Sequence, residues 1–235
     1  MNQRVALGKP AEAGEKILGR RFRLTKRFSN IVQNGGRLLD LGCGNGALTE
    51  LFAPAFDEVV GVDIQPSLLK QTRIDARWVT AAGEELPFPD NYFDAVVSYE
   101  VIEHVVSPVR TILEIHRVLK PGGQAVISVP HKWWIFETHG AHLPLLPWNR
   151  VPFFSWLPES IHSRWAKARI YSRTKLERTL RNGGFERISI HHITAPMDRA
   201  KPRAVREFLQ RTVFGFDTTP LPFAAVSLLA VVTKD

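Results

Sequence analysis

The stretch Arg37–Gly46, RLLDLGCGNG, decides the fold of this chain. An apolar run that ends at Asp40 and breaks into Gly42, Gly44 and Gly46 predicts a buried strand, a turn, and a helix that begins at the third glycine. Glycine lets the backbone of such a turn approach a ligand with no side chain in between. The stretch therefore predicts a cradle for a nucleotide-type cofactor.

A second acidic strand end follows at Asp63, in EVVGVDI. Gly42, Gly44 and Ala47 also satisfy the dinucleotide fingerprint, and Asp63 stands 21 residues after Gly42, at the ribose-binding distance. The glycine spacing alone thus leaves a dehydrogenase open. Asp40 favours another ligand, because a negative charge just before the loop opposes a pyrophosphate at the helix N-terminus and suits a cation.

With Asp40, three glycines in one loop, Asp63 on the next strand and the segment GEELPFPD at residues 83–90, the chain resembles the class I S-adenosylmethionine-dependent methyltransferases. Within them it looks like the branch of the quinone-pathway O-methyltransferases. The resemblance covers about residues 35–130. It implies that the glycine loop passes under the methionine part of the cofactor, that the Asp40 region faces the ammonium and sulfonium end, and that Asp63 binds both ribose hydroxyls.

The same resemblance implies that the residues around Ala82, Gly83 and Glu84 line the adenine. Relatives often carry an aspartate where Ala82 stands, so adenine recognition here is expected to rest on backbone groups near Gly83 or on Glu84. The cofactor-binding residues expected on this basis are Asp40, Gly42, Cys43, Gly44, Asn45, Gly46, Asp63, Ile64, Gly83, Glu84, Glu85, Leu86, Tyr99 and Glu100.

Strands alternate with helices along the chain, which predicts an α/β fold with a doubly wound, mostly parallel sheet whose ligands bind at the carboxyl ends of the strands. The resemblance adds a Rossmann-like sheet of seven strands with an antiparallel last strand. We expect strands at residues 37–40, 58–63, 78–79, 95–98, 124–129, 185–193 and 226–232, and helices at 12–33, 47–53, from 66 to about 72, and 172–183. A further helix should end at Lys120, with Leu113, His116, Val118 and Leu119 on its apolar side.

We expect one methyltransferase domain over residues 1–235: an N-terminal helix at 12–33, a cofactor core at 35–130, an insertion at 131–170 and a C-terminal part at 171–235. The insertion holds five of the six tryptophans and shows no helical or strand period. Its place after the fifth strand favours a lid over the cofactor crevice. It could equally be an insertion with a core of its own, and its aromatics could instead contact a membrane interface or an isoprenoid-like tail.

The net charge of +8 is unevenly distributed. Residues 1–37 carry nine Lys and Arg against two acids, residues 38–161 eight against fifteen, and residues 162–211 thirteen against four. Such basic flanks could steer RNA or an anionic membrane surface, or they could be solvated helix faces. The single cysteine, Cys43, and the lack of a long apolar run predict a cytoplasmic protein with no leader and no transmembrane segment.

Methyl transfer from a sulfonium mainly requires alignment of donor and acceptor and the exclusion of water. A general base is needed where the acceptor is a hydroxyl, and histidine suits that role near neutral pH. His104 and His131 stand at strand ends that face the expected crevice, so both are candidate catalytic residues.

Glu100, Glu103 and His104 form the motif E-x-x-E-H, whose spacing places all three on one face of a helix. Such a set could hold a divalent ion that orients a catechol. The motif resembles that of quinone-pathway O-methyltransferases and of RNA 3′-end methyltransferases. Because the sequence identifies no fourth ligand, a divalent metal is possible but not favoured, and the three residues remain candidate ligands. His139 and His142 are expected to be polar groups of the lid.

These patterns together predict an S-adenosylmethionine-dependent methyltransferase that acts on a small or lipid-like acceptor, at oxygen. An RNA-modifying methyltransferase that uses the basic flanks is the alternative, followed by a non-catalytic cofactor-binding protein and a dehydrogenase. Peripheral membrane contact through the aromatic insertion and the basic C-terminal part is also open.

Overall fold

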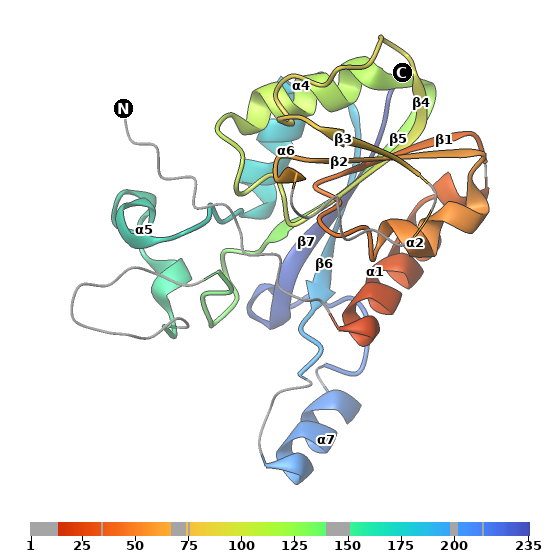
Figure 1. Cartoon of the computed structure of the whole chain (residues 1–235). Helices are drawn as coiled ribbons and strands as arrows, with labels where there is room; N and C mark the ends of the chain where they lie inside the picture. The colour runs from red at the N-terminus through yellow and green to blue at the C-terminus, as the bar shows by residue number, and fades with distance from the viewer. Residues whose placement is uncertain are drawn as a thin grey trace.

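A seven-stranded sheet in the order β3-β2-β1-β4-β5-β7-β6 forms the centre of the molecule (Figure 1). The computed structural model describes residues 14–33, 35–66, 74, 76–139, 151–197, 202–212 and 214–235. β1 to β5 pair in parallel, and β7 runs antiparallel to both β5 and β6, which confirms the predicted fold class. The strands are β1 Arg37–Leu41, β2 Glu58–Asp63, β3 Arg77–Thr80, β4 Phe93–Tyr99, β5 Leu119–Pro130, β6 Arg187–Thr194 and β7 Ala225–Thr233.

Helices cover both faces of the sheet because its strands carry apolar side chains on both sides. Leu39 of β1 packs in one apolar cluster and its neighbour Leu38 in another, as the two-residue period of a strand requires. The first cluster includes side chains of α4 (Pro108–Val118) and α6 (Arg173–Asn182). The second is closed by α1 (Glu15–Phe28) and α2 (Thr49–Phe52). The sheet thus forms the middle layer of three.

The helix predicted at residues 172–183 is confirmed, including both of its ends. Ser172 caps α6 by accepting a hydrogen bond from the backbone N–H of Lys175 at 3.2 Å, and Gly183 follows the last helical residue. Another helix was predicted from residue 66 to about 72, and all of these residues after Pro66 lie outside the described part of the chain, so that prediction stays open.

Two details predicted for the next helix are wrong. α4 ends at Val118 rather than Lys120, because the residue before Pro121 avoids the helical region and Leu119 is already extended. Leu113 was expected on the apolar side but is 46% exposed. The buried stripe instead runs through Ile112 and Ile115, and Leu113 stands about 100° around the helix from Ile112.

The C-terminal part contains one more helix between β6 and β7. α7 spans Arg203–Arg211, begins after Pro202, and carries an ion pair of 2.6 Å between Arg203 and Glu207 one turn apart. It extends away from the sheet (Figure 1). The remaining short elements are α5 Glu159–Trp165, η1 Ile31–Gln33, η2 Ala53–Ala55, η3 Phe154–Trp156 and η4 Pro222–Ala224. Within the described part of the chain, no helix has the length and hydropathy to cross a bilayer.

The contact between α4 and α6 depends on a residue without a side chain. A Cβ atom at Gly183 would lie 2.1 Å from Cγ2 of Ile112, which is fully buried. We expect Gly183→Ala to lower the free energy of unfolding by about 1 to 3 kcal/mol, because the two helices must separate to make room. Gly14→Ala is the matched control, since a Cβ there meets nothing within 4 Å among the described atoms. Denaturant unfolding of both variants measures the difference, and equal midpoints would contradict the expectation.

Candidate functional site

The glycine loop turns back over the end of β2. Gly42, Gly44 and Gly46 have φ angles of 76°, 56° and 77°, in the left-handed region that glycine adopts without steric cost. The backbone N–H groups of Gly42 and Cys43 both donate to the carbonyl oxygen of Val62, at 2.7 and 3.1 Å. The loop is therefore fixed to the neighbouring strand by main-chain hydrogen bonds.

The first two glycines face different surroundings. A Cβ at Gly42 would lie 2.1 Å from Cγ2 of Val101, so packing alone excludes a side chain there. A Cβ at Gly44 would meet nothing within 4 Å among the described atoms, so this glycine borders open space. Cys43 between them is buried, and burial raises the pKa of its thiol well above the usual range. The loop thus fits a cofactor held over Gly44, and Cys43 is not a reactive thiol.

Asp63 completes the loop from the next strand. Its Oδ2 accepts a hydrogen bond from the N–H of Gly44 at 3.0 Å, and its Oδ1 accepts one from the N–H of Gln65 at 2.8 Å. The carboxylate is half-buried at the carboxyl end of β2, and Ile64 after it is exposed. Asp63 therefore fixes the loop and borders the same open edge as Gly44.

Asp40 lies behind the loop rather than on its surface. Its side chain is buried in β1, and the hydroxyl of Thr49 donates to its Oδ2 at 2.6 Å. Burial raises the pKa of Asp40 to about 6, and the guanidinium of Arg21 and the Thr49 hydrogen bond act in the opposite direction. The carboxyl is thus a poorly solvated charge near the base of the cradle.

The segment expected to face adenine is tied down by two carboxylates. Oε1 of Glu84 accepts from the N–H of Ser107 at 3.0 Å, and Oε2 of Glu114 accepts from the N–H of Leu86 at 2.8 Å. The side chain of Leu86 packs in the sheet core, so this predicted cofactor residue offers its backbone rather than its side chain. Gly83 is buried, whereas Glu85 and Asn45 are exposed.

Helix α1 lies against the end of β4 and brings an arginine to the site. The hydroxyls of Thr25 and Tyr99 are 2.6 Å apart, and Tyr99 donates to the backbone oxygen of Arg21 at 3.0 Å. The Arg21 guanidinium lies 5.3 Å from the centre of the Tyr99 ring, a cation–π distance. Burial raises the pKa of Tyr99 to about 12, so the phenol stays protonated. The sequence offered no signal that separated Arg21 from the other arginines of this helix.

Glu100, Glu103 and His104 lie in a turn, not on a helix as predicted. Glu100, directly after the last residue of β4, lies in the left-handed region at a φ of 60°, and the next helix begins only at Pro108. Arg169 of the insertion binds this turn: its guanidinium donates to the backbone oxygens of Val105 and Val106, and its own N–H donates to that of Glu103 at 3.1 Å. The three residues still converge, because the turn folds them over the end of the strand.

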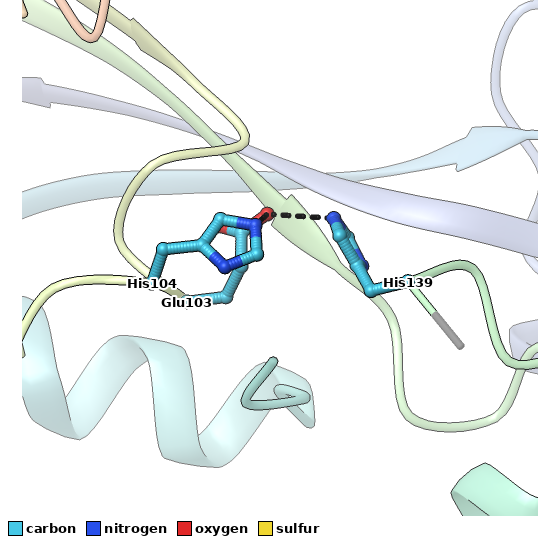
Figure 2. Close-up of side chains that lie close together, drawn as sticks. All are labelled: Glu103, His104 and His139. Atoms are coloured by element: carbon cyan, nitrogen blue, oxygen red, sulfur yellow. Dashed lines mark ion pairs between the residues drawn. The ribbon is translucent and has the colours of Figure 1, made fainter. Parts of the chain in front are cut away.

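The structure adds His139 to this group (Figure 2). Nε2 of His139 lies 3.4 Å from Oε1 of Glu103 and 3.8 Å from Oε2 of Glu100, and Nε2 of His104 lies 3.9 Å from Oε1 of Glu103. One potential ligand atom from each of Glu103, His104 and His139 lies within 4.8 Å of the others. His139 was predicted only as a polar group of the lid, since a histidine 35 residues after His104 has no motif spacing. His142 lies outside the described residues.

Burial sets the charge state of this cluster. It raises the pKa of Glu103 well above its ordinary value, and the neighbouring charge of Glu100 adds to the effect. It lowers the pKa of His104 to about 4, with His139 acting in the same direction. His104 is therefore a neutral imidazole at neutral pH.

His131, the second predicted catalytic histidine, lies at the end of β5 but is only 3% exposed. Its Nδ1 is 3.3 Å from the backbone oxygen of Ala225, and its ring contacts that of His192 with 5.0 Å between centroids. Burial lowers the pKa of His131 to about 4. An acceptor reaches this ring only after a local rearrangement, and the catalytic assignment of His131 stays a prediction.

The described part of the insertion has a small polar core. Glu137 and His162 are buried and 2.9 Å apart, and the hydroxyl of Ser155 donates to the same carboxylate oxygen at 3.3 Å. Aromatic and aliphatic side chains cover its outside and remain substantially exposed: Trp133, Phe136, Phe153, Trp156 and Ile161. The insertion thus combines a core of its own with an apolar outer surface, and it delivers His139 to the end of the sheet.

Comparisons with known proteins identify the family. Residues 39–127 match the model of a methyltransferase domain. The chain is 33% identical over 197 residues to the ubiquinone/menaquinone biosynthesis C-methyltransferase UbiE of Stutzerimonas stutzeri. This alignment covers 73% of this chain and 75% of the relative. The chain belongs to the class I S-adenosylmethionine-dependent methyltransferases.

Other relatives of this methyltransferase agree. It is 34% identical over 149 residues to a ubiquinone biosynthesis O-methyltransferase of Pseudomonas aeruginosa. This alignment spans 57% of this chain and 63% of the relative, which is less than two thirds of the relative's length. A crystal structure of an S-adenosylmethionine-dependent methyltransferase from Mesorhizobium loti superposes with a TM-score of 0.64 at 17% identity, covering 92% of this chain and 98% of that one, which supports the fold. The predicted enzyme class and cofactor are confirmed.

For cofactor binding, we expect Asp63→Ala to weaken the affinity of the methyltransferase for S-adenosylmethionine about 10- to 100-fold, because hydrogen bonds to a carboxylate contribute about 1.5 to 3 kcal/mol. Asp63→Asn should lose less, since an amide oxygen can still accept from Gly44. Glu177→Ala, which removes an exposed carboxylate on α6, is the control. Calorimetric titration measures all three, and an unchanged affinity in Asp63→Ala would contradict the assignment.

For stability, the buried Asp40 predicts a pH dependence. Its pKa of about 6 in the folded protein lies about two units above that of a free aspartate, so the folded state binds the proton more tightly and the free energy of unfolding falls as the pH rises from about 4 to about 6. We expect Asp40→Asn to remove this fall and to stabilise the cofactor-free protein at pH 7 by at most about 3 kcal/mol. Denaturant unfolding at pH 4.5 and pH 7 is the measurement. A variant that keeps the wild-type pH slope would show that Asp40 is not its source.

Proposed function

We propose that this methyltransferase transfers the methyl group to a hydroxyl oxygen of a small, lipid-like molecule. The cluster of Glu103, His104 and His139 at the end of β4 carries the proposal. A hydroxyl acceptor must lose its proton, and this cluster combines a neutral imidazole with the buried carboxylate of Glu103, close in sequence to Val101, whose side chain packs against Gly42 of the glycine loop. A carrier that only binds the cofactor has no need of such groups.

The cofactor is proposed to lie across the carboxyl ends of β1 and β2. Asp63 binds the ribose hydroxyls, the loop from Gly42 to Gly46 passes under the methionine part, and Asp40 stabilises the cationic end from behind the loop. Backbone groups near Gly83 meet the adenine, because the carboxylate of Glu84 is already hydrogen-bonded to Ser107. The open side of Gly44 and the half-buried carboxylate of Asp63 support this placement.

When bound, S-adenosylmethionine supplies a methyl group already activated on a sulfonium. Transfer of that methyl group to a hydroxyl oxygen would leave a neutral sulfide and would release the hydroxyl proton, for which the neutral imidazole of His104 is the proposed acceptor. The residues of this chain therefore need to orient the hydroxyl, exclude water and favour loss of its proton. We assign these tasks to the cluster around His104 and to the insertion, which acts as the cover of the acceptor site.

The lipid-like character of the acceptor rests on two observations. Relatives at 33% and 34% identity are named for ubiquinone biosynthesis. The insertion also exposes aromatic side chains, among them Trp133 and Trp156, with Lys132 close to the Trp133 ring, a combination that suits an isoprenoid tail or a membrane interface. RNA is less favoured, because Arg20 of the basic N-terminal flank is committed to Asp217 and to the backbone of Thr194.

The test uses a catechol that carries a short isoprenoid chain and the same catechol without it, each incubated with the enzyme and labelled S-adenosylmethionine. We expect methylation at oxygen, identified by mass spectrometry and NMR, and a higher kcat/KM for the prenylated compound. His104→Ala should lower kcat about 100-fold or more and leave cofactor affinity unchanged.

His191→Ala is the matched control, since His191 lies on β6 stacked on Phe28 and outside the cluster. Methylation at carbon would overturn the choice of acceptor atom. Wild-type turnover in His104→Ala would show that this histidine takes no part in the reaction.

A further inference from the structure

A cavity of about 310 Å³ lies where the insertion meets the first turns of α6. Its size is at the lower end of the roughly 300 to 1,000 Å³ that small-molecule pockets occupy. None of its lining residues belongs to the glycine loop, to the adenine segment or to the cluster of Glu103, His104 and His139. The cavity is therefore separate from the site of methyl transfer.

The charged residues that line this cavity leave a positive excess. Lys132, Lys175 and Arg178 are its cations, and Glu159 is the one acid among the lining residues. Lys175 is ion-paired with Glu159, and its ammonium lies 5.4 Å from the centre of the Tyr171 ring. Three positive charges against one negative charge give a net charge of +2, which suits an anionic ligand.

Two of the three cations are not committed to a carboxylate. The structure gives the exposed Arg178 no hydrogen bond or ion pair within the part of the chain that it describes. The ammonium of Lys132 lies 5.4 Å from the centre of the Trp133 ring, and none of the described carboxylates is within ion-pair distance of it. Arg181, one turn further along α6, is by contrast paired with Glu177 at 3.0 Å.

Helix α6 places several donors on one of its faces. Thr174 and Lys175 precede Arg178 by four and three residues, so their side chains are neighbours on the helix surface. The hydroxyl oxygen of Ser172 accepts from the N–H of Lys175 at 3.2 Å, which leaves its own proton free to donate. Cationic and hydroxyl donors thus face the same cavity.

The net charge and the donors together fit a phosphate group. A phosphate monoester carries about −1.5 to −2 charges at pH 7 and three strong acceptor oxygens, whereas a carboxylate carries a single charge. A guanidinium such as that of Arg178 can bind two phosphate oxygens at once, and an ammonium such as that of Lys132 adds a point charge. We propose that this cavity binds the phosphate group of an organic molecule.

The rest of the ligand meets an apolar part of the lining. Leu157 of the insertion and the buried Ile170 complete the cavity, so they offer a surface to carbon atoms rather than to charge. A soluble phosphate monoester and the headgroup of a phospholipid share this chemistry. The experiment below separates these two sources.

Glu159 competes with the ligand for the same cations. The hydrogen bond from Lys175 lowers the pKa of Glu159, and the charge of Lys132 acts in the same direction. A bound phosphate must share both cations with this carboxylate, so its removal should strengthen binding. Glu159 belongs to the insertion and Lys175 to α6, and a phosphate between them would join the two segments.

Binding is measured on the full chain, without acceptor or S-adenosylmethionine, so the outcome does not depend on the proposed methyl acceptor. Inorganic phosphate, phenyl phosphate and benzoate are titrated by calorimetry at low ionic strength, where screening is weak. We expect one phenyl phosphate per chain, bound more tightly than inorganic phosphate and at least tenfold more tightly than benzoate. Phenyl phosphate should also raise the midpoint of thermal unfolding.

Four variants locate the site. Arg178→Ala and Lys132→Ala should each lower the affinity for phenyl phosphate about three- to tenfold, and Glu159→Gln should raise it. Arg181→Ala removes the same charge from the same helix outside the cavity, so it should bind as the wild type does. No binding by the wild type at millimolar phenyl phosphate, or equal losses in Arg178→Ala and Arg181→Ala, would overturn the proposal.

Sedimentation with vesicles identifies the source of the phosphate. Vesicles of phosphatidylcholine are compared with vesicles that also contain phosphatidylglycerol. Binding that requires phosphatidylglycerol and that Arg178→Ala weakens more than Arg181→Ala does would assign the cavity to a lipid headgroup. Binding of phenyl phosphate without binding to either vesicle would assign it to a soluble phosphate monoester.

Discussion

The hydrogen bond from Gly44 to Asp63 is the contact on which the cofactor end of the molecule depends. It joins the loop after β1 to the carboxylate of the last residue of β2, so a turn of three left-handed glycines is held by the strand beside it. The parallel pairing of β1 with β2 and β4 brings the remaining groups to the same edge. The carboxyl ends of parallel strands lie side by side at one edge of the sheet. Residues at the ends of different strands therefore border one crevice.

The sequence predicted the features that depend on a local pattern of residues, such as a periodic apolar run or the glycines that interrupt it. The glycines, the acid at Asp63, the sheet and the capped α6 all carry signals within a few residues of chain, and the structure agrees with them. The helical E-x-x-E-H face was wrong because spacing cannot show that Glu100 leaves its strand in the left-handed region. Arg21 and His139 could not be found, since their places in the site come from the packing of α1 and of the insertion against the sheet.

Two buried carboxylates with raised pKa values lie at or just after the carboxyl ends of the parallel strands β1 and β4. Asp40 and Glu103 are each less than 3% exposed and each has a raised pKa, whereas Asp94 at the opposite edge is half-buried, paired with Lys120, and has a lowered one. Desolvated carboxylates destabilise a folded protein unless a cation compensates them. A cationic ligand such as the proposed sulfonium cofactor would relieve the cost of burying Asp40.

The insertion at residues 131–170 cannot be replaced as freely as a surface loop usually can, because two of its residues contact the turn after β4. Arg169, near the end of the insertion, donates hydrogen bonds to the backbone oxygens of Glu103, Val105 and Val106, in the turn that carries Glu103 and His104. His139, near the start of the insertion, contacts the side chains of the same two residues. The insertion, which is expected to select the acceptor, thus also holds the residues of the proposed catalytic cluster in place. In evolution, a new acceptor could be accommodated by changes between these two anchors, while replacement of the whole segment would dismantle the site that it covers.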